Sequence, residues 1–205
     1  MIVVATAAFA ILGFQPVAYA LPPERISWTA QATCEYRAIA ALHPDPRLRG
    51  GDLLAAKFCG TLRLPRKYEA ARDVIDESPE SYAGFFYVNA RTRHIDEQLK
   101  AAAREGVKQV LVLGAGFDSR AYRFHDVYPR LKFFEIDLSA TTRAKQDAVI
   151  RVLGHLPQYV KYVAIDFDAQ TLDSELPAAG YDPEKRSLSP NVRAGRLPTW
   201  RPIRL

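Results

Sequence analysis

Short apolar runs alternate with amphipathic stretches along the second half of the chain. The runs are rich in β-branched and aromatic residues, and a stretch with the 3.6-residue period of a helix follows each of them. The expected strands are Val107–Leu113, Leu131–Ile136 and Val160–Ile165. The helical stretches begin near Ser119, run from Ser139 to Leu153, and lead toward Leu172 and Leu176. Three strand-helix units in tandem predict an α/β fold, a parallel sheet with right-handed crossovers and helices on both faces.

The preceding part of the chain has a helical pattern instead. Between Ile26 and Ala103, proline and glycine interrupt alanine-rich and leucine-rich stretches, which predicts several short helices and one longer helix. The longer helix is expected to begin at the capping signal Ser78-Pro79-Glu80 and to end near Gly106. The chain is therefore divided into an apolar segment 1–21, a helical region 22–105, an α/β region 106–183 and a basic tail 184–205.

The apolar segment 1–21 contains no charged side chain, which is typical of a cleavable signal or a membrane anchor. Ala18-Tyr19-Ala20 has the small-residue pattern of a cleavage site. No lysine or arginine precedes the apolar run, however, and Pro16 would kink a spanning helix. Membrane association through residues 1–21 thus stays open beside two alternatives, a buried N-terminal helix and a mis-assigned start.

The net charge of +5 comes from the tail. Six of the 28 basic residues lie between Glu184 and Leu205 with one acidic residue, so the chain before position 184 carries equal numbers of basic and acidic side chains. A neutral body lacks the basic face that phosphates require, and we expect no nucleic-acid partner. The tail also brings three prolines without helical or strand periodicity. It is interpreted either as a flexible tail or as an out-of-frame sequence that begins after about residue 188.

Composition adds little to this picture. A chain of 205 residues, 48% of them hydrophobic, can bury a core without disulfides or metals. Cys34 and Cys59 allow one bridge and lack the spacing of a zinc site, so we expect no metal and infer no redox compartment.

Polar signals occur at the carboxyl ends of the expected strands, where parallel sheets bind ligands. Gly114 and Gly116 let the backbone approach a ligand closely, although a tight turn alone also uses such glycines. Asp137 ends the second strand about 20 residues beyond Gly116, the spacing at which an acid reaches ribose hydroxyls. Glu135 lies on the same face of that strand, so the sequence leaves open which acid meets the ligand.

Asp166 and Phe167 follow the third strand. A carboxylate can accept from an exocyclic amine, and an aromatic ring can lie against a flat base. The three strand ends together favour an adenosine-containing ligand, with NAD and S-adenosylmethionine as the candidates. A pyrophosphate site is the less favoured of the two, because the third glycine of the dinucleotide fingerprint is missing after Gly116.

Four strings in the chain resemble the leucine carboxyl methyltransferase family of S-adenosylmethionine-dependent enzymes, particularly its bacterial members. They are Ala90–Asp96 (ARTRHID), Val112–Arg123 (VLGAGFDSRAYR), Phe134–Leu138 (FEIDL) and Ile165–Phe167 (IDF). The resemblance covers about residues 26–183. It implies a class I methyltransferase fold, a Rossmann-like parallel sheet with a helical N-terminal cap over S-adenosylmethionine. It also implies O-methylation of a carboxyl or hydroxyl group on a small molecule or peptide.

The same resemblance assigns roles to single residues. It places Arg91 on the methionine carboxylate, Gly114 and Gly116 beside the methionine moiety, Asp137 on the ribose, and Asp166 with Phe167 on the adenine side. A guanidinium matches a carboxylate in two parallel bonds. Without the resemblance, Arg91 would be interpreted as a solvated residue on a helix face. Asp118 and Arg120 are expected to pair locally and shape the turn, and no catalytic residue is predicted.

The family continues with a fourth strand and a Trp-Glu-Gly motif that this sequence does not contain. We therefore expect a sheet without its C-terminal half, in which the first strand has an unpaired apolar edge. Four alternatives stay open. They are a methyltransferase whose other half a partner supplies, a truncated and inactive cofactor-binding remnant, a membrane-tethered binding module that keeps the nucleotide pocket without catalysis, and an NAD-dependent oxidoreductase. Because S-adenosylmethionine is expected in the cytosol, a cytoplasmic chain, anchored or free, is favoured over a secreted one.

Overall fold

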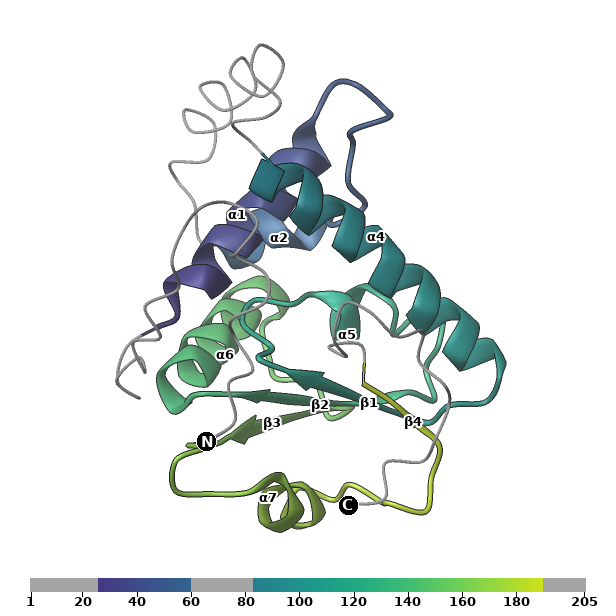
Figure 1. Ribbon diagram of the computed structural model, residues 1–205, viewed down its shortest axis with the longest axis vertical. Coiled ribbons are helices and arrows are strands. Elements are labelled where there is room, and N and C mark those ends of the chain that lie inside the picture. The colour runs from purple at the N-terminus through teal and green to yellow at the C-terminus, as the bar shows by residue number, and fades with distance from the viewer. Residues whose placement is uncertain (1–25, 60–82, 190–205) are drawn as a thin grey trace.

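The computed structural model describes residues 26–59 and 83–189 of the chain (Figure 1). Three helices come first: α1 (Trp28–Leu42), α2 (Leu53–Phe58) and α4 (Ala83–Arg104). Strands and helices then alternate as β1 (Gln109–Leu113), α5 (Arg120–Arg123), β2 (Lys132–Asp137), α6 (Ser139–Leu153), β3 (Val160–Ala164), α7 (Leu172–Ala178) and β4 (Ser187–Leu188). The α/β fold predicted from the sequence is confirmed.

The strands form one parallel sheet in the order β3-β2-β1-β4. β1, β2 and β3 coincide with the three predicted apolar runs, so the predicted parallel sheet is confirmed. β1 pairs with β2 from Gln109 opposite Lys132 to Leu113 opposite Ile136. Because the strands are parallel, the residues that follow β1, β2 and β3 come together at one edge of the sheet.

The expectation that β1 has an unpaired edge is wrong for the first two residues of the strand, Gln109 and Val110, because β4 pairs with them. Val110 lies opposite Leu188, whose side chain is only 3% exposed and joins the main core. The side chain of Gln109 also exchanges two hydrogen bonds with the backbone of Asp182, at 2.7 and 2.9 Å. Residues 184–189, which the sequence assigned to an irregular tail, thus include a strand of two residues, too short to show a period.

Helices cover both faces of the sheet, as predicted. Val110 and Val112 belong to a larger core cluster on the face covered by the N-terminal helices. Phe134 and Ile136 belong to a smaller cluster on the other face, with Leu176 of α7. Figure 1 shows α7 alone below the sheet and α6, α1 and α4 above it. Strand residues are therefore apolar on both sides, which explains why the strands appear in the sequence as continuous apolar runs.

A left-handed glycine follows the C-terminal end of α6 and of α4. α6 has the bounds predicted from its period, and Gly154 after it has a φ of 80°. Gly106 follows the end of α4 with a φ of 87°, also as expected. Glycine adopts this left-handed conformation without the steric cost that a Cβ adds. The expected start of the long helix at residues 78–80 lies outside the described residues, and the helix expected from Ser119 is the single turn α5.

Helix α1 is held near its start and again further along. The Ser27 side chain caps α1 by accepting from the Ala30 N–H, and the Ser27 N–H donates to Thr141 Oγ1 in the first turn of α6 at 3.2 Å. Further along α1, Cys34 forms a disulfide with Cys59 at the end of α2. The one bridge that the sequence permits is therefore made, and it joins α1 to α2.

The apolar segment 1–21 and residues 190–205 of the predicted tail lie outside the described residues. Within residues 26–59 and 83–189, no helix has the length and apolar character needed to cross a membrane. The same residues hold no group of three or more His, Cys, Asp or Glu side chains arranged for a metal ion.

Candidate functional site

The turn after β1 brings two left-handed glycines to the edge where the strands end. Gly114 has a φ of 63° and Gly116 a φ of 48°. The Ala115 N–H donates to the carbonyl oxygen of Ile136 at 3.0 Å, which ties this turn to the end of β2. A Cβ added to Gly114 would meet no atom within 4 Å, whereas one added to Gly116 would lie 2.9 Å from the Cβ of Ala30. The turn is therefore open above Gly114 and covered by α1 above Gly116.

Alanine substitutions should separate these two positions. Both variants carry the strain of a left-handed backbone, roughly 1–2 kcal/mol each, but only Gly116→Ala also presses on Ala30. We expect Gly116→Ala to lower the free energy of unfolding by about 1 kcal/mol more than Gly114→Ala does, measured by urea denaturation. Equal losses in the two variants would show that α1 yields at this contact.

Asp137 stands at the end of β2 beside this turn. Its Oδ2 accepts from the Gly116 N–H at 2.6 Å, and its Oδ1 accepts from the Leu138 N–H at 2.7 Å. Burial raises the pKa of Asp137, and these two backbone bonds oppose the rise. Each carboxylate oxygen keeps a further lone pair, so the half-buried side chain can still accept hydrogen bonds from a ligand.

Glu135 has a different environment from Asp137. Its side chain is 2% exposed, and Oε2 lies 2.7 Å from Nζ of Lys145 on α6. Desolvation raises the pKa of Glu135 to about 7, although the charge of Lys145 lowers it. Of the two acids that the sequence could not separate, Glu135 is therefore paired inside the fold, and Asp137 is at the strand end.

The end of β3 lies next to Asp137. The Ile165 N–H donates to the Asp137 carbonyl oxygen at 3.0 Å, so Asp166 and Phe167 follow directly beside the β2 end. Asp166 Oδ1 accepts from the Asp168 N–H at 3.0 Å. The Phe167 side chain is 56% exposed, which leaves its ring accessible to a flat ligand.

The structure thus brings five of the six predicted site residues to one edge of the sheet: Gly114, Gly116, Asp137, Asp166 and Phe167. Arg91, the sixth, lies on α4 with an exposed side chain. Among the described residues, no hydrogen bond or ion pair joins Arg91 to this edge. Its role as a carboxylate ligand stays a prediction.

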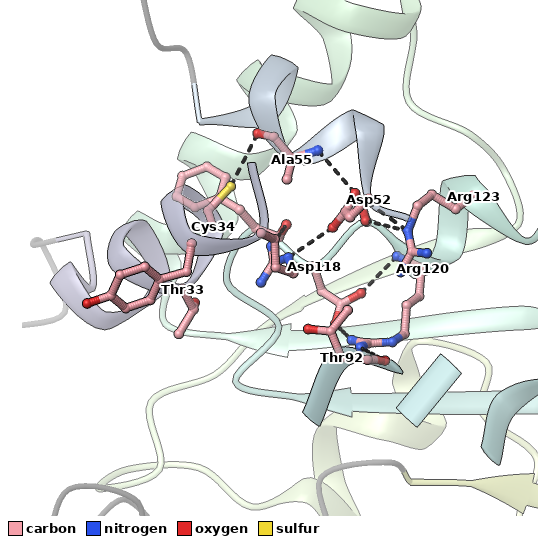
Figure 2. Close-up of polar contacts among 12 residues, drawn as sticks. Thr33, Cys34, Asp52, Ala55, Thr92, Asp118, Arg120 and Arg123 are labelled. Atoms are coloured by element: carbon pink, nitrogen blue, oxygen red, sulfur yellow. Dashed lines mark hydrogen bonds and ion pairs between the residues drawn. The ribbon is translucent and has the colours of Figure 1, made fainter. Parts of the chain in front are cut away.

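A buried network of charges surrounds the start of α5. It joins three arginines to three aspartates, and Figure 2 shows part of it. Its members are Arg37, Arg120 and Arg123 with Asp52, Asp96 and Asp118. Arg120 pairs with Asp118, so the local pair predicted from the sequence is confirmed, and Arg120 also bonds Asp96 at 2.7 Å. Burial opposes ionisation of Asp118, but the charges of Arg120, Lys145 and Arg37 outweigh it and hold the pKa of Asp118 well below its ordinary value.

Sequence reasoning missed most of this network. The signal that was available is on α1, where Arg37 interrupts an otherwise apolar face formed by Cys34, Ala38 and Ala41. A charged side chain on a buried helix face needs a partner inside the fold. The partners themselves lie at the start of α2 and in the glycine turn, far along the chain.

A cavity of about 510 Å³ opens between α2, α4 and α5. Leu53, Leu54 and Phe124 line it together with charged side chains. None of the six predicted site residues contributes to its lining. The candidate site is the strand-end edge, because the open glycine turn and the carboxylates at that edge can contact a ligand.

Comparison with known proteins identifies the family. The sequence profile described as "Leucine carboxyl methyltransferase" matches residues 31–190, a range that begins within α1 and extends past β4. The chain belongs to the leucine carboxyl methyltransferase family. The resemblance seen in the four sequence strings is thereby confirmed, and with it the Rossmann-like fold of that family.

Individual relatives in the family share one name. A protein named "Putative S-adenosyl-L-methionine-dependent methyltransferase" from Mycolicibacterium paratuberculosis is 32% identical over 78% of this chain and 53% of its own length. One of the same name from Frankia alni is 31% identical over 81% of this chain and 57% of its own length. A relative of the same name from Streptomyces coelicolor is 31% identical over 78% of this chain and 55% of its own length. The chain spans about half the length of the curated relatives that it matches.

Proposed function

We propose that this protein transfers a methyl group from S-adenosylmethionine, which binds at the carboxyl ends of β1, β2 and β3. The observation that carries the proposal is the position of Asp137. Two backbone N–H groups hold its carboxylate at the open edge beside Gly114, and its remaining lone pairs suit the two hydroxyls of a ribose. Family membership and the names of the relatives support the same ligand.

The other site residues have matching roles in this proposal. Gly114 lets the backbone approach the methionine moiety, because no side chain fills the space above it. Asp166 and the exposed ring of Phe167 receive the adenine, and Arg91 takes the methionine carboxylate. The cofactor supplies an electrophilic methyl group on a positively charged sulfur. The protein has to hold the acceptor oxygen about 3 Å from that methyl group, in line with the sulfur and away from water.

We further propose a carboxyl or hydroxyl group of a small molecule or peptide as the methyl acceptor. A carboxylate acceptor is already deprotonated near pH 7 and needs no general base. The described histidines favour no such base either. His94 and His155 are exposed, His125 stacks on Tyr159 with ring centroids 3.5 Å apart, and the buried His43 accepts from the Asp45 N–H after α1, away from the strand ends. No catalytic residue is therefore assigned. A cytoplasmic location accompanies this proposal, because the cofactor is expected there.

Thermal shift measurements test the cofactor. S-adenosylmethionine at 100 times its dissociation constant should stabilise the folded chain by about 2.7 kcal/mol, which raises the melting temperature by roughly 5 °C or more in a chain of this size. NADH at the same concentration should have no effect. A shift with NADH alone would replace this proposal by the oxidoreductase alternative.

Methylation of carboxyl and hydroxyl acceptors, assayed on the same preparation, separates turnover from binding. Binding without turnover on any acceptor would favour a cofactor-binding protein that has no catalytic activity. That candidate is kept because the chain covers only 53% and 57% of the relatives from M. paratuberculosis and F. alni.

A further inference from the structure

Helix α1 contacts the glycine turn at two consecutive residues. Ala30 lies against Gly116, and Nη2 of Arg37 donates to the carbonyl oxygen of Phe117 at 2.8 Å. Ala30 and Arg37 are two helical turns apart, so both project from one face of the helix. That face therefore presses on the turn with an apolar contact and holds it with a charged hydrogen bond.

Arg37 is itself fixed by an anchor inside the fold. Its side chain is 9% exposed, and its Nε donates to Oδ2 of Asp52 at 2.9 Å. Asp52 caps α2 by accepting from the Ala55 N–H at 3.1 Å, and its Oδ1 lies 3.5 Å from Nε of Arg123 (Figure 2). Because Asp52 is held from two other sides, it sets the position of the Arg37 guanidinium rather than following it.

The turn passes this restraint on to Asp137. The Asp118 N–H closes the turn on the Ala115 carbonyl oxygen at 2.8 Å, and the Gly116 N–H donates to Asp137 Oδ2 at 2.6 Å. A glycine with a positive φ has no side chain to limit its backbone, so the direction of its N–H depends on what holds the neighbouring peptide groups. One of those groups carries the Phe117 carbonyl that Arg37 binds.

We propose that Arg37 is a positioning residue for the cofactor site. Anchored by Asp52, it fixes the Phe117 carbonyl and thereby aims the Gly116 N–H at the Asp137 carboxylate. The identity of the ligand that Asp137 then receives rests on the function proposed above. The geometric coupling from α1 to Asp137 does not depend on that function.

The variant Arg37→Gln in the full chain tests the coupling with two readouts. Titration calorimetry should give an affinity for S-adenosylmethionine about tenfold weaker than wild type. Without cofactor, the NMR signal of the Gly116 amide proton should move upfield, because its short hydrogen bond to a carboxylate lengthens. Arg37→Lys keeps the charge and loses the planar fork, so its affinity and its Gly116 amide signal should lie between those of wild type and Arg37→Gln.

Two further variants distinguish the loss of the positioning contact from a general loss of stability. Leu99→Ala removes a fully buried side chain on α4, in the same core and outside the groups that hold the turn, and serves as the destabilised control. Asp52→Asn keeps an oxygen for the cap of α2 and weakens the anchor of Arg37 together with the ion pair to Arg123. It should lower the affinity about threefold in a chain that still folds.

The outcomes separate the two proposals. If Arg37→Gln and Asp52→Asn keep the wild-type affinity and the wild-type Gly116 amide signal, and only melt earlier as Leu99→Ala does, the positioning role is wrong. If the wild-type chain binds no S-adenosylmethionine, the proposed function fails, and the Gly116 signal alone still decides whether Arg37 positions the turn.

Discussion

Replacing Asp137 by alanine should abolish the binding of S-adenosylmethionine. The change removes both oxygens that are available to the ribose hydroxyls, and it leaves the Gly116 N–H without its acceptor. Two hydrogen bonds to a charged group are together worth about 3–6 kcal/mol, so the affinity should fall by a factor of at least about 100. Calorimetric titration measures the affinity, and the thermal shift with cofactor should disappear as well.

Matched variants show whether the loss belongs to the carboxylate. Asp137→Asn keeps one acceptor oxygen and removes the cost of burying a charge, which is what raises the pKa of Asp137. Without cofactor, its melting temperature should therefore be closer to that of wild type than the melting temperature of Asp137→Ala is. Its affinity for S-adenosylmethionine should still drop. Asp147→Ala, at an exposed acid on the neighbouring helix α6, should change neither property. An Asp137→Ala chain that keeps the wild-type thermal shift would remove the ribose role from this residue.

The sheet was predictable because its signals are local. β1 and β2 are buried on both faces and β3 has apolar residues facing both clusters, so each appears as an apolar run whatever the rest of the chain does. β4 gave no such signal. Its two residues become a strand only through pairing with Gln109 and Val110, from which β2 and β3 separate them in the sequence.

The site was predictable in part, for a related reason. The glycines and carboxylates that follow the strands are positioned by the sheet itself, so knowledge of the strands was enough to bring five of the predicted residues together. The choice between Glu135 and Asp137 depended on Lys145, which lies on another element. The contact between Arg37 and Phe117 spans 80 residues, and no local pattern predicts such a pair.

The buried pair of Glu135 and Lys145 leads to the second large effect. Both side chains are 2% exposed, and the Tyr122 hydroxyl lies 3.4 Å from Glu135 Oε2. Lys145→Met removes the positive charge, so above pH 7 the folded variant has to keep a proton on Glu135 or bury an uncompensated carboxylate. Urea denaturation at pH 9 should show the loss, up to about 1.4 kcal/mol for each pH unit above 7 and so about 3 kcal/mol. The double variant Glu135→Gln with Lys145→Met removes both charges and should recover most of it.

The pH dependence identifies Glu135 as the cause. Because burial raises its pKa from an ordinary 4.5 to about 7, the folded chain binds more protons than the unfolded chain between these values. The free energy of unfolding that Glu135 contributes therefore falls as the pH rises through that window, by up to about 3 kcal/mol. The free energy of unfolding of wild type minus that of Glu135→Gln should fall with pH in this way between pH 4.5 and 7. Asp118, whose pKa lies below this window, and the exposed acids contribute equally to both chains there.

The Lys145→Met variant should extend the same dependence above pH 7. Without the lysine charge, which lowers the pKa of Glu135 in the wild type, that pKa rises further. The charge part of the cost should therefore be small below pH 7, where Glu135 stays protonated in both folded chains, and should grow toward pH 9, where only the variant keeps that proton. A cost that is the same at both ends of this range would mean that lost packing of the Lys145 side chain, rather than the charge of Glu135, destabilises the variant.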